Sequence, residues 1–157
     1  MDGMGYDSIE RELHIEATPE VVYQVISKPE HLREWWPDEA EIEAVPGARG
    51  VVSFGDPNAP DAKVVPLTVM EADPPRRFSF RWAYDQGEIA ESVDSLLVTF
   101  ELVPSGTGTL LRFTETGFRD RDWQEEVLVA QYGQHAAGWD HFLPRLVAYA
   151  VRTVSKP

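Results

Sequence analysis

The chain has 157 residues, of which 43% are hydrophobic and 26% are charged, and this composition is typical of a single globular domain. It contains no cysteine, which excludes a disulfide framework, thiolate zinc sites and cysteine catalysis. The 27 acidic and 14 basic residues give a formal net charge of −13, so the protein repels phosphate backbones and anionic membranes, and we expect no nucleic-acid partner.

We expect a flexible N-terminus over residues 1–7, which include two glycines, followed by one domain over residues 8–157. The N-terminal segment is acidic and lacks the basic and apolar regions of a signal peptide. No stretch approaches the about 18–20 apolar residues that a membrane-spanning helix needs, so we expect no membrane insertion. Together with the lack of cysteine, these features favour a cytoplasmic protein.

The first predicted element is a half-buried strand that starts at Ser8. Hydrophobic and polar residues alternate there with a period of two. This alternation directs one set of side chains toward the core, namely Ile9, Arg11, Leu13 and Ile15. Arg11 is the charged member of this inward set, and it needs a partner of opposite charge if it is buried.

Two short helices are expected after this strand. Thr18 is placed to cap the first helix, and Pro19 occupies the first helical position, where proline is favoured. Pro29 ends this helix and starts a second one, which Pro37 stops. The apolar stripe of the first helix consists of Val21, Val22, Val25 and Ile26.

The middle of the chain predicts about six further strands, because short segments rich in β-forming residues alternate with turn residues. These segments are Glu41–Val45, Gly50–Phe54, Val64–Ala72, Arg77–Tyr84, Leu96–Leu102 and Thr109–Phe118. Pro66 offers no N–H to a ladder, which favours an edge position or a bulge for its strand. The polar segment 85–94 is expected to be a hairpin connection or a loop. Short connections favour antiparallel neighbours.

A long helix is expected at the C-terminus. Asp122 and Glu125 have the spacing of a capping box at its start. Its apolar stripe, of the kind that packs on a sheet, consists of Trp139, Phe142, Leu143, Leu146, Val147 and Ala150. Gly133, Gly138 and Pro144 interrupt this segment, which predicts a kink near residues 137–139 or 140–144.

Five segments along the chain carry a family resemblance when they are taken in order. They are Ile15–Tyr23, Pro29–Pro37, Asp73–Phe78 with Trp82, Gly108–Phe118, and Gly138–Trp139 with Leu143 and Leu146. This ordered set resembles the START-like superfamily known as SRPBCC, which includes polyketide-cyclase-like and birch-pollen-allergen-like proteins. The branch that it resembles is named after homologues of the activator of the heat-shock-protein ATPase, and the resemblance extends over residues 8–153.

The resemblance implies an α+β helix-grip fold. In this fold a curved antiparallel sheet of about seven strands surrounds the long C-terminal helix, and two short helices follow strand one. It also implies a hydrophobic cavity between sheet and helix, which the superfamily uses for lipids, hormones and polyketides. Pro144 departs from the pattern because proline disturbs a helix interior, so we expect a cavity volume that differs from that of relatives.

Polar chemistry is sparse in the sequence, and we expect no metal site, no cofactor and no covalent catalysis. None of the four histidines has a recognised ligand spacing, and no serine has a nucleophile motif. Glu115 shares the inward face of the last strand with Leu111 and Phe113. It forms either a buried ion pair with Arg11 or a polar anchor for a ligand, with general acid–base chemistry as the further possibility.

Large aromatic side chains accompany Glu115 on the expected inner faces, where they form either plain core or the lining of a cavity. The candidate ligand-binding residues are Trp35, Trp36, Phe54, Phe80, Trp82, Tyr84, Glu115, Trp139, Phe142 and Leu143. We therefore expect a protein, monomeric or weakly dimeric, that binds a small hydrophobic or amphipathic ligand such as a lipid or polyketide without catalysis. The alternatives are a cyclase-, aromatase- or hydrolase-type enzyme using Glu115 and Tyr84, or a chaperone-cofactor-like interaction module.

Overall fold

The computed structural model describes residues 8–55, 63–82, 96–118 and 124–155. The elements in chain order are β1 (Ser8–Ile15), α1 (Pro19–Ser27), α2 (Pro29–Trp35), β2 (Glu39–Glu41), β3 (Arg49–Phe54), β4 (Lys63–Asp73), β5 (Arg77–Trp82), β6 (Leu96–Ser105), β7 (Gly108–Thr116) and α3 (Glu125–Ser155). The strands form one antiparallel sheet in the order β1-β7-β6-β5-β4-β3-β2. Thus the first strand pairs with the last.

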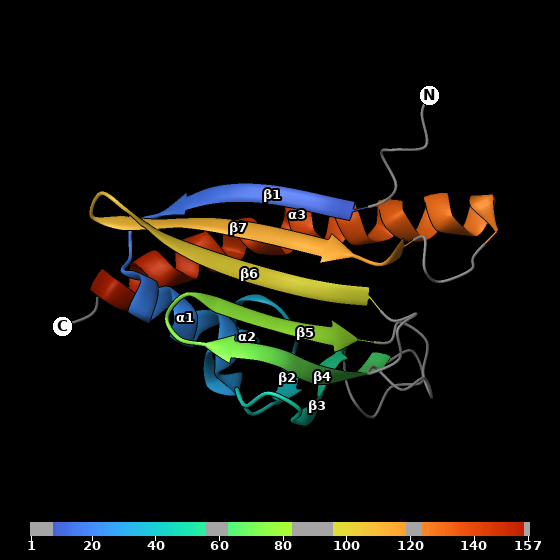
Figure 1. Ribbon diagram of the computed structural model, residues 1–157, viewed down its shortest axis with the longest axis horizontal. Helices are drawn as coiled ribbons and strands as arrows, with labels where there is room; N and C mark the ends of the chain where they lie inside the picture. Colours follow the sequence, from blue (N-terminus) through green and yellow to red (C-terminus); the bar gives the residue numbers. More distant parts are fainter. Residues whose placement is uncertain (1–7, 56–62, 83–95, 119–123, 156–157) are drawn as a thin grey trace.

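The three helices lie on one face of this sheet, as Figure 1 shows. The long helix α3 runs behind β1, β7 and β6, and the short helices α1 and α2 lie beside its C-terminal half. This arrangement confirms the predicted α+β helix-grip fold with seven strands. Each layer has one apolar face, and packing these two faces together removes both from water.

Local sequence signals explain most of the element boundaries. The Thr18 side chain caps α1 by accepting a hydrogen bond from the backbone N–H of Val21 at 3.3 Å, and Pro19 and Pro29 occupy the first turns of α1 and α2. The alternating strand residues are buried as predicted on β5, β6 and β7. These buried residues are Phe78, Phe80, Trp82, Leu96, Val98, Phe100, Leu102, Leu111, Phe113 and Glu115.

The strand expected at Glu41–Val45 is wrong in its bounds. It shares only Glu41 with β2, and the end of the expected segment enters a turn in which Ala48 N–H donates to the Val45 carbonyl. Of the two alternatives for the strand with Pro66, the edge position is wrong, since β4 lies between β3 and β5. The strand does carry a bulge or irregularity of register, which lies between Val69 and Glu71.

Helix α3 is one helix of 31 residues with Pro144 inside it. Pro144 is exposed, so water can satisfy the carbonyl oxygen that its missing N–H leaves without a partner. The kink expected near this residue stays a prediction. The capping residue Asp122 and the segment 85–94 lie outside the described residues.

Arg11 ties β1 to α3 instead of pairing with Glu115. Arg11 Nε donates to Asp140 Oδ1 at 2.7 Å, and Arg11 Nη2 donates to Asp140 Oδ2 at 3.2 Å. In the β1–β7 ladder Arg11 lies opposite Phe113, and Ile9 lies opposite Glu115. The expected Arg11–Glu115 ion pair is therefore wrong, because Arg11 turns toward the helix and reaches a carboxylate at the protein surface.

The outer face of the sheet carries a row of ion pairs that crosses five strands. Glu12 pairs with Arg112 at 3.1 Å, Arg112 with Glu101 at 3.8 Å, Glu101 with Arg77 at 3.8 Å, and Arg77 with Glu71 at 3.7 Å. Each exposed pair adds little stability by itself. As a set they mark the outer face as solvated, so that a register slip by one residue would bury charges.

We predict that Gly108→Ala lowers the free energy of unfolding by about 1–3 kcal/mol. An added methyl group at Gly108 would overlap the carbonyl oxygen of Ile15, where β7 begins beside the end of β1. Gly133→Ala is the matched control, since nothing lies within 4 Å of an added Cβ there, and it should gain about 0.5–1 kcal/mol. Urea unfolding followed by circular dichroism measures both. Equal stability of wild type and Gly108→Ala would contradict this close approach.

We also predict that the contribution of Asp140 to stability depends on pH. The hydrogen bond from Arg11 holds the pKa of the Asp140 carboxyl below its usual value. The stabilisation is therefore complete above the ordinary pKa of about 3.9 and is lost as the pH falls through the lower folded-state value.

Asp140→Asn should accordingly cost at most about 1 kcal/mol at pH 7, because the Asp140 side chain is 57% exposed. The difference from wild type should shrink as the pH is lowered toward 3, as measured by urea unfolding. Glu34→Gln is the control: its carboxylate has no hydrogen bond or ion pair to any residue that the structure describes, and no pH-dependent difference is expected. A difference for Asp140→Asn that grows on acidification would contradict the assigned ion pair.

Candidate functional site

Among the residues that the structure describes, one carboxylate is fully buried, that of Glu115 of β7, which lies among nitrogen donors from two other elements. Trp82 Nε1 of β5 donates to Glu115 Oε2 at 2.8 Å, and Trp139 Nε1 of α3 donates to Oε1 at 2.9 Å. His135 Nδ1, also on α3, lies 3.0 Å from both oxygens. We call Glu115, Trp82, His135 and Trp139 the Glu115 cluster.

The local sequence brings these four residues together. Alternation along β7 directs Glu115 inward, and Trp82 is the last residue of β5 on the same face of the sheet. His135 and Trp139 are four residues apart on α3, so they share one face of the helix. A carboxylate loses its hydration when it is buried, and hydrogen bonds from nitrogen donors offset much of that cost.

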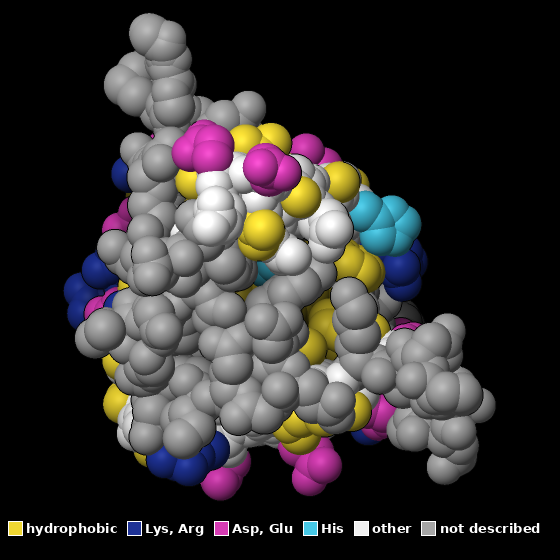
Figure 2. Space-filling view, turned by 90° about the vertical axis from the view of Figure 1, so that its right-hand side faces the viewer, with side chains coloured by type: hydrophobic (Ala, Val, Ile, Leu, Met, Phe, Trp, Pro, Cys, Tyr) yellow, Lys and Arg dark blue, Asp and Glu magenta, His cyan; other side chains and the backbone are white. Residues whose placement is uncertain are grey.

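A pocket of about 290 Å³ lies directly beside the Glu115 cluster, between the sheet and the first half of α3. Its lining is mostly aromatic and consists of Trp36, Phe54, Val65, Trp82, Gln134, His135, Gly138, Trp139 and Phe142. Figure 2 faces this end of the molecule, and hydrophobic side chains are visible there in a recess. The pocket thus lies at the end of the sheet where β5 ends, beside residues 134–142 of α3.

The aromatic rings of the lining pack closely on one another. The ring centroid of Trp36 lies 5.2 Å from that of Trp139, 5.4 Å from that of Trp82 and 5.9 Å from that of Phe54. The ring centroids of Phe142 on α3 and Phe54 on β3 lie 6.3 Å apart, so these two half-buried rings meet across the sheet–helix interface. Such a wall offers ring faces and edges to a flat ligand.

Five of the candidate ligand-binding residues line this pocket: Trp36, Phe54, Trp82, Trp139 and Phe142. Glu115 does not line the pocket. It lies behind Trp82, His135 and Trp139, with which its carboxylate forms hydrogen bonds. Both of its oxygens contact side chains of the pocket wall, and a direct contact of Glu115 with a ligand stays a prediction. Tyr84, the second group of the enzyme hypothesis, lies outside the described residues.

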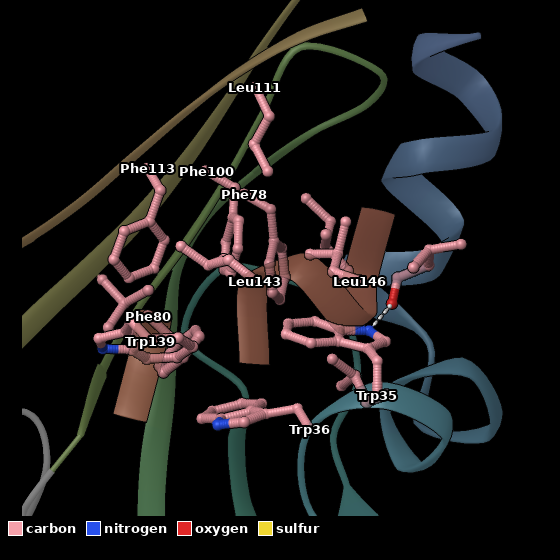
Figure 3. Close-up of a cluster of buried hydrophobic side chains, with 14 of the residues drawn as sticks. Trp35, Trp36, Phe78, Phe80, Phe100, Leu111, Phe113, Trp139, Leu143 and Leu146 are labelled. Atoms are coloured by element: carbon pink, nitrogen blue, oxygen red, sulfur yellow. Dashed lines mark hydrogen bonds between the residues drawn. The ribbon is translucent and has the colours of Figure 1, made fainter. Parts of the chain in front are cut away.

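The other three candidates belong to the filled part of the core, which Figure 3 shows. Trp35 is completely buried and its Nε1 donates to the Val25 carbonyl at 3.0 Å. Phe80 and Leu143 are each 1% exposed and pack among the neighbouring aromatic and aliphatic side chains. These residues support the pocket from behind without lining it.

Sequence reasoning missed four lining residues, namely Val65, Gln134, His135 and Gly138. Alternation on β4 could have identified Val65. The spacing of four between His135 and Trp139 could have placed His135 on the inner face of α3.

Within the part of the chain that the structure describes, no group of three or more His, Cys, Asp or Glu side chains could hold a metal ion. Among the same residues, no helix is long and apolar enough to cross a membrane.

Comparisons with known proteins agree with this architecture. The family model for Activator of Hsp90 ATPase homolog 1-like protein matches residues 16–150. Protein MLL2253 from Mesorhizobium loti is 26% identical, with a TM-score of 0.73 over 93% of this chain and 98% of that one. No curated protein matches the sequence.

Two further solved structures share the fold at lower identity. CalU16 from Micromonospora echinospora is 21% identical, with a TM-score of 0.65 over 91% of this chain and 75% of its own. The Aha1 dimer from Colwellia psychrerythraea is 22% identical, with a TM-score of 0.67 over 89% of this chain and 92% of its own. The matched residues 16–150 include α1, α2, the strands from β2 to β7 and most of α3. The chain therefore belongs to the family of Activator of Hsp90 ATPase homolog 1-like proteins, a branch of the SRPBCC superfamily that its motifs resemble.

Proposed function

We propose that this protein binds a small, flat, largely aromatic ligand in the pocket between the sheet and α3. The observation that carries the proposal is the aromatic lining beside a polar edge formed by His135 and Gln134. A volume of about 290 Å³ is near the lower end of the range for small-molecule sites, about 300–1,000 Å³. One or two fused rings suit this space better than a sterol or a long acyl chain.

The family and the fold support ligand binding by an SRPBCC domain in general. The narrower choice of an aromatic ligand is supported by the chemistry of the wall. Trp36, Trp82 and Trp139 present extended ring surfaces, and aromatic pairs are stabilised beyond the area that they bury.

The interaction-module alternative has less support from the described surface. Its large exposed hydrophobic side chains lie on the β2–β3 loop, on β4 and on α3, and they are Val45, Val64, Met70, Val127 and Val129. Spread over three elements, they are typical of ordinary surface residues. As for assembly, we propose a monomer or a weak homodimer, and of these two states the solved Aha1 dimer from Colwellia psychrerythraea supports the homodimer.

Filling the pocket tests the proposed site. Gly138 lines the pocket, nothing lies within 4 Å of a Cβ added to it, and leucine favours a helix more than glycine does. Gly138→Leu should therefore fold and weaken binding of the probe 2-naphthol at least tenfold, as measured by isothermal titration calorimetry. Gly133→Leu makes the same change outside the pocket and should bind within twofold of wild type. Wild-type affinity in Gly138→Leu would contradict the site.

A thermal-shift panel tests the proposed ligand class. A ligand that binds only the folded state adds about 2.7 kcal/mol at 100 times its Kd, which corresponds to a rise in Tm of about 5–10 °C. We expect this rise for bicyclic aromatic compounds and not for sterols or long-chain fatty acids. Saturable stabilisation by sterols or fatty acids, with no response to bicyclic aromatics, would contradict the proposed class.

A further inference from the structure

We propose that the indole N–H of Trp36 donates a hydrogen bond to the ligand, and that it selects flat aromatic compounds with an acceptor on the ring edge, such as a ring nitrogen or a ring carbonyl. The inference rests on the proposed function, since it concerns the ligand of the same pocket. Three tryptophans line this pocket, Trp36, Trp82 and Trp139, and their N–H groups are used differently.

The first step concerns the partners of these three N–H groups. Trp82 Nε1 and Trp139 Nε1 donate to the oxygens of Glu115 at 2.8 Å and 2.9 Å. Trp36 Nε1 donates to no residue that the structure describes, although Trp36 is only 6% exposed. A buried N–H group without any acceptor is rare, because it loses its hydration without compensation. The acceptor for Trp36 must therefore come from the space beside it, as water or as part of a ligand.

The second step is the access of Trp36 Nε1 to that space. Among the described residues, the polar side-chain atoms with neither a partner nor accessible surface do not include Trp36 Nε1, so this atom keeps accessible surface. Trp36 lines the pocket, and Figure 3 shows its nitrogen on the edge of the indole that points away from Trp35. Trp35 Nε1 donates instead to the Val25 carbonyl. The end of α2 thus directs one indole N–H into the core and the next one toward the pocket.

The Trp36 ring is held in place by its neighbours rather than by a hydrogen bond of the indole. Its centroid lies 6.0 Å from that of Trp35, 5.7 Å from that of Phe80 and 5.2 Å from that of Trp139. The backbone N–H of Trp36 donates to the Leu32 carbonyl at 2.9 Å, which fixes the chain at the end of α2. A donor that is oriented before binding loses little conformational freedom when a ligand arrives.

The third step is what this donor means for a ligand. An indole N–H can donate a hydrogen bond but cannot accept one. A ring nitrogen or a carbonyl oxygen placed against Trp36 Nε1 gains a hydrogen bond, whereas a C–H group at the same place leaves the donor without an acceptor. One neutral hydrogen bond corresponds to an affinity difference of roughly three- to tenfold.

Proton–nitrogen NMR of the indole groups tests whether this donor is available. The chain has five tryptophans, and loss of one indole signal in Trp36→Phe assigns the signal of Trp36. In the free protein the Trp36 N–H should exchange with D2O faster than the most protected indole N–H groups. Quinoline should move the Trp36 proton signal downfield, and naphthalene, which has no acceptor, should not. A Trp36 N–H that is as protected as the slowest indole N–H would overturn the proposal.

The affinities of the same two probes test the selection. Quinoline and naphthalene have the same shape and are both uncharged near neutral pH, but only quinoline carries an acceptor. Trp36→Phe should reduce the preference for quinoline over naphthalene roughly three- to tenfold, as measured by isothermal titration calorimetry. Phe142→Leu is the matched control, because it removes a ring from the pocket wall but no N–H, and it should leave the ratio of the two Kd values within about twofold of wild type.

The outcomes separate this inference from the proposed function. An unchanged ratio in Trp36→Phe, with both probes still bound, would overturn donation by Trp36 and leave the proposed function standing. Absence of binding of both probes to wild type would contradict the proposed function itself. If Trp36→Phe does not fold, Trp36→3-benzothienylalanine takes its place, since this side chain keeps the size of the indole and lacks the N–H.

Discussion

A negatively charged group inside an apolar core constrains the whole molecule. Glu115 is completely buried, and its oxygens accept hydrogen bonds from side chains of β5 and α3. A buried carboxylate that loses its partners costs several kcal/mol. The sheet and the long helix must therefore dock in one register, because only that register brings Trp82, His135 and Trp139 together around β7.

The same constraint separates the interior into a filled part and an open part. Toward the C-terminal half of α3, Phe100 and Phe113 pack with ring centroids 5.3 Å apart, and Leu143 and Leu146 fill the space beside them (Figure 3). Toward the N-terminal half, the indoles of the Glu115 cluster are directed at the carboxylate, and Gly138 contributes no side chain. The pocket is the space that results.

Periodicity along the sequence predicts the faces of the strands and helices well. The alternation on β5, β6 and β7, the cap at Thr18 and the proline at the start of α2 are local signals, and the structure confirms them. The strand predicted at Glu41–Val45 was misplaced, because the chain enters a turn at Val45 and the actual strand β2 ends at Glu41. The interior position of the strand with Pro66 depends on the order of strands in the sheet, which no local pattern contains.

The site was predictable only in part for the same reason. Glu115 was correctly placed on the inner face, but its partner depends on how α3 crosses β7, and Arg11 proved to contact Asp140 instead. A lone histidine in a helix gives a weak signal, because only the tertiary structure brings His135 to a carboxylate twenty residues earlier in the chain. Helix–sheet docking, rather than any local pattern, creates the polar centre.

The pairing of β1 with β7 also determines the order in which the protein can assemble during translation. β1 is synthesised before the other strands of this sheet, yet its ladder partners, from Thr109 to Thr116, belong to the strand that is synthesised last. The strands from β2 to β6 can form hairpins with their sequence neighbours in the meantime. Until β7 has been synthesised, the backbone N–H and C=O groups of β1 have no strand to pair with. During this interval β1 can pair with a strand of another copy of the chain, which leads to aggregation.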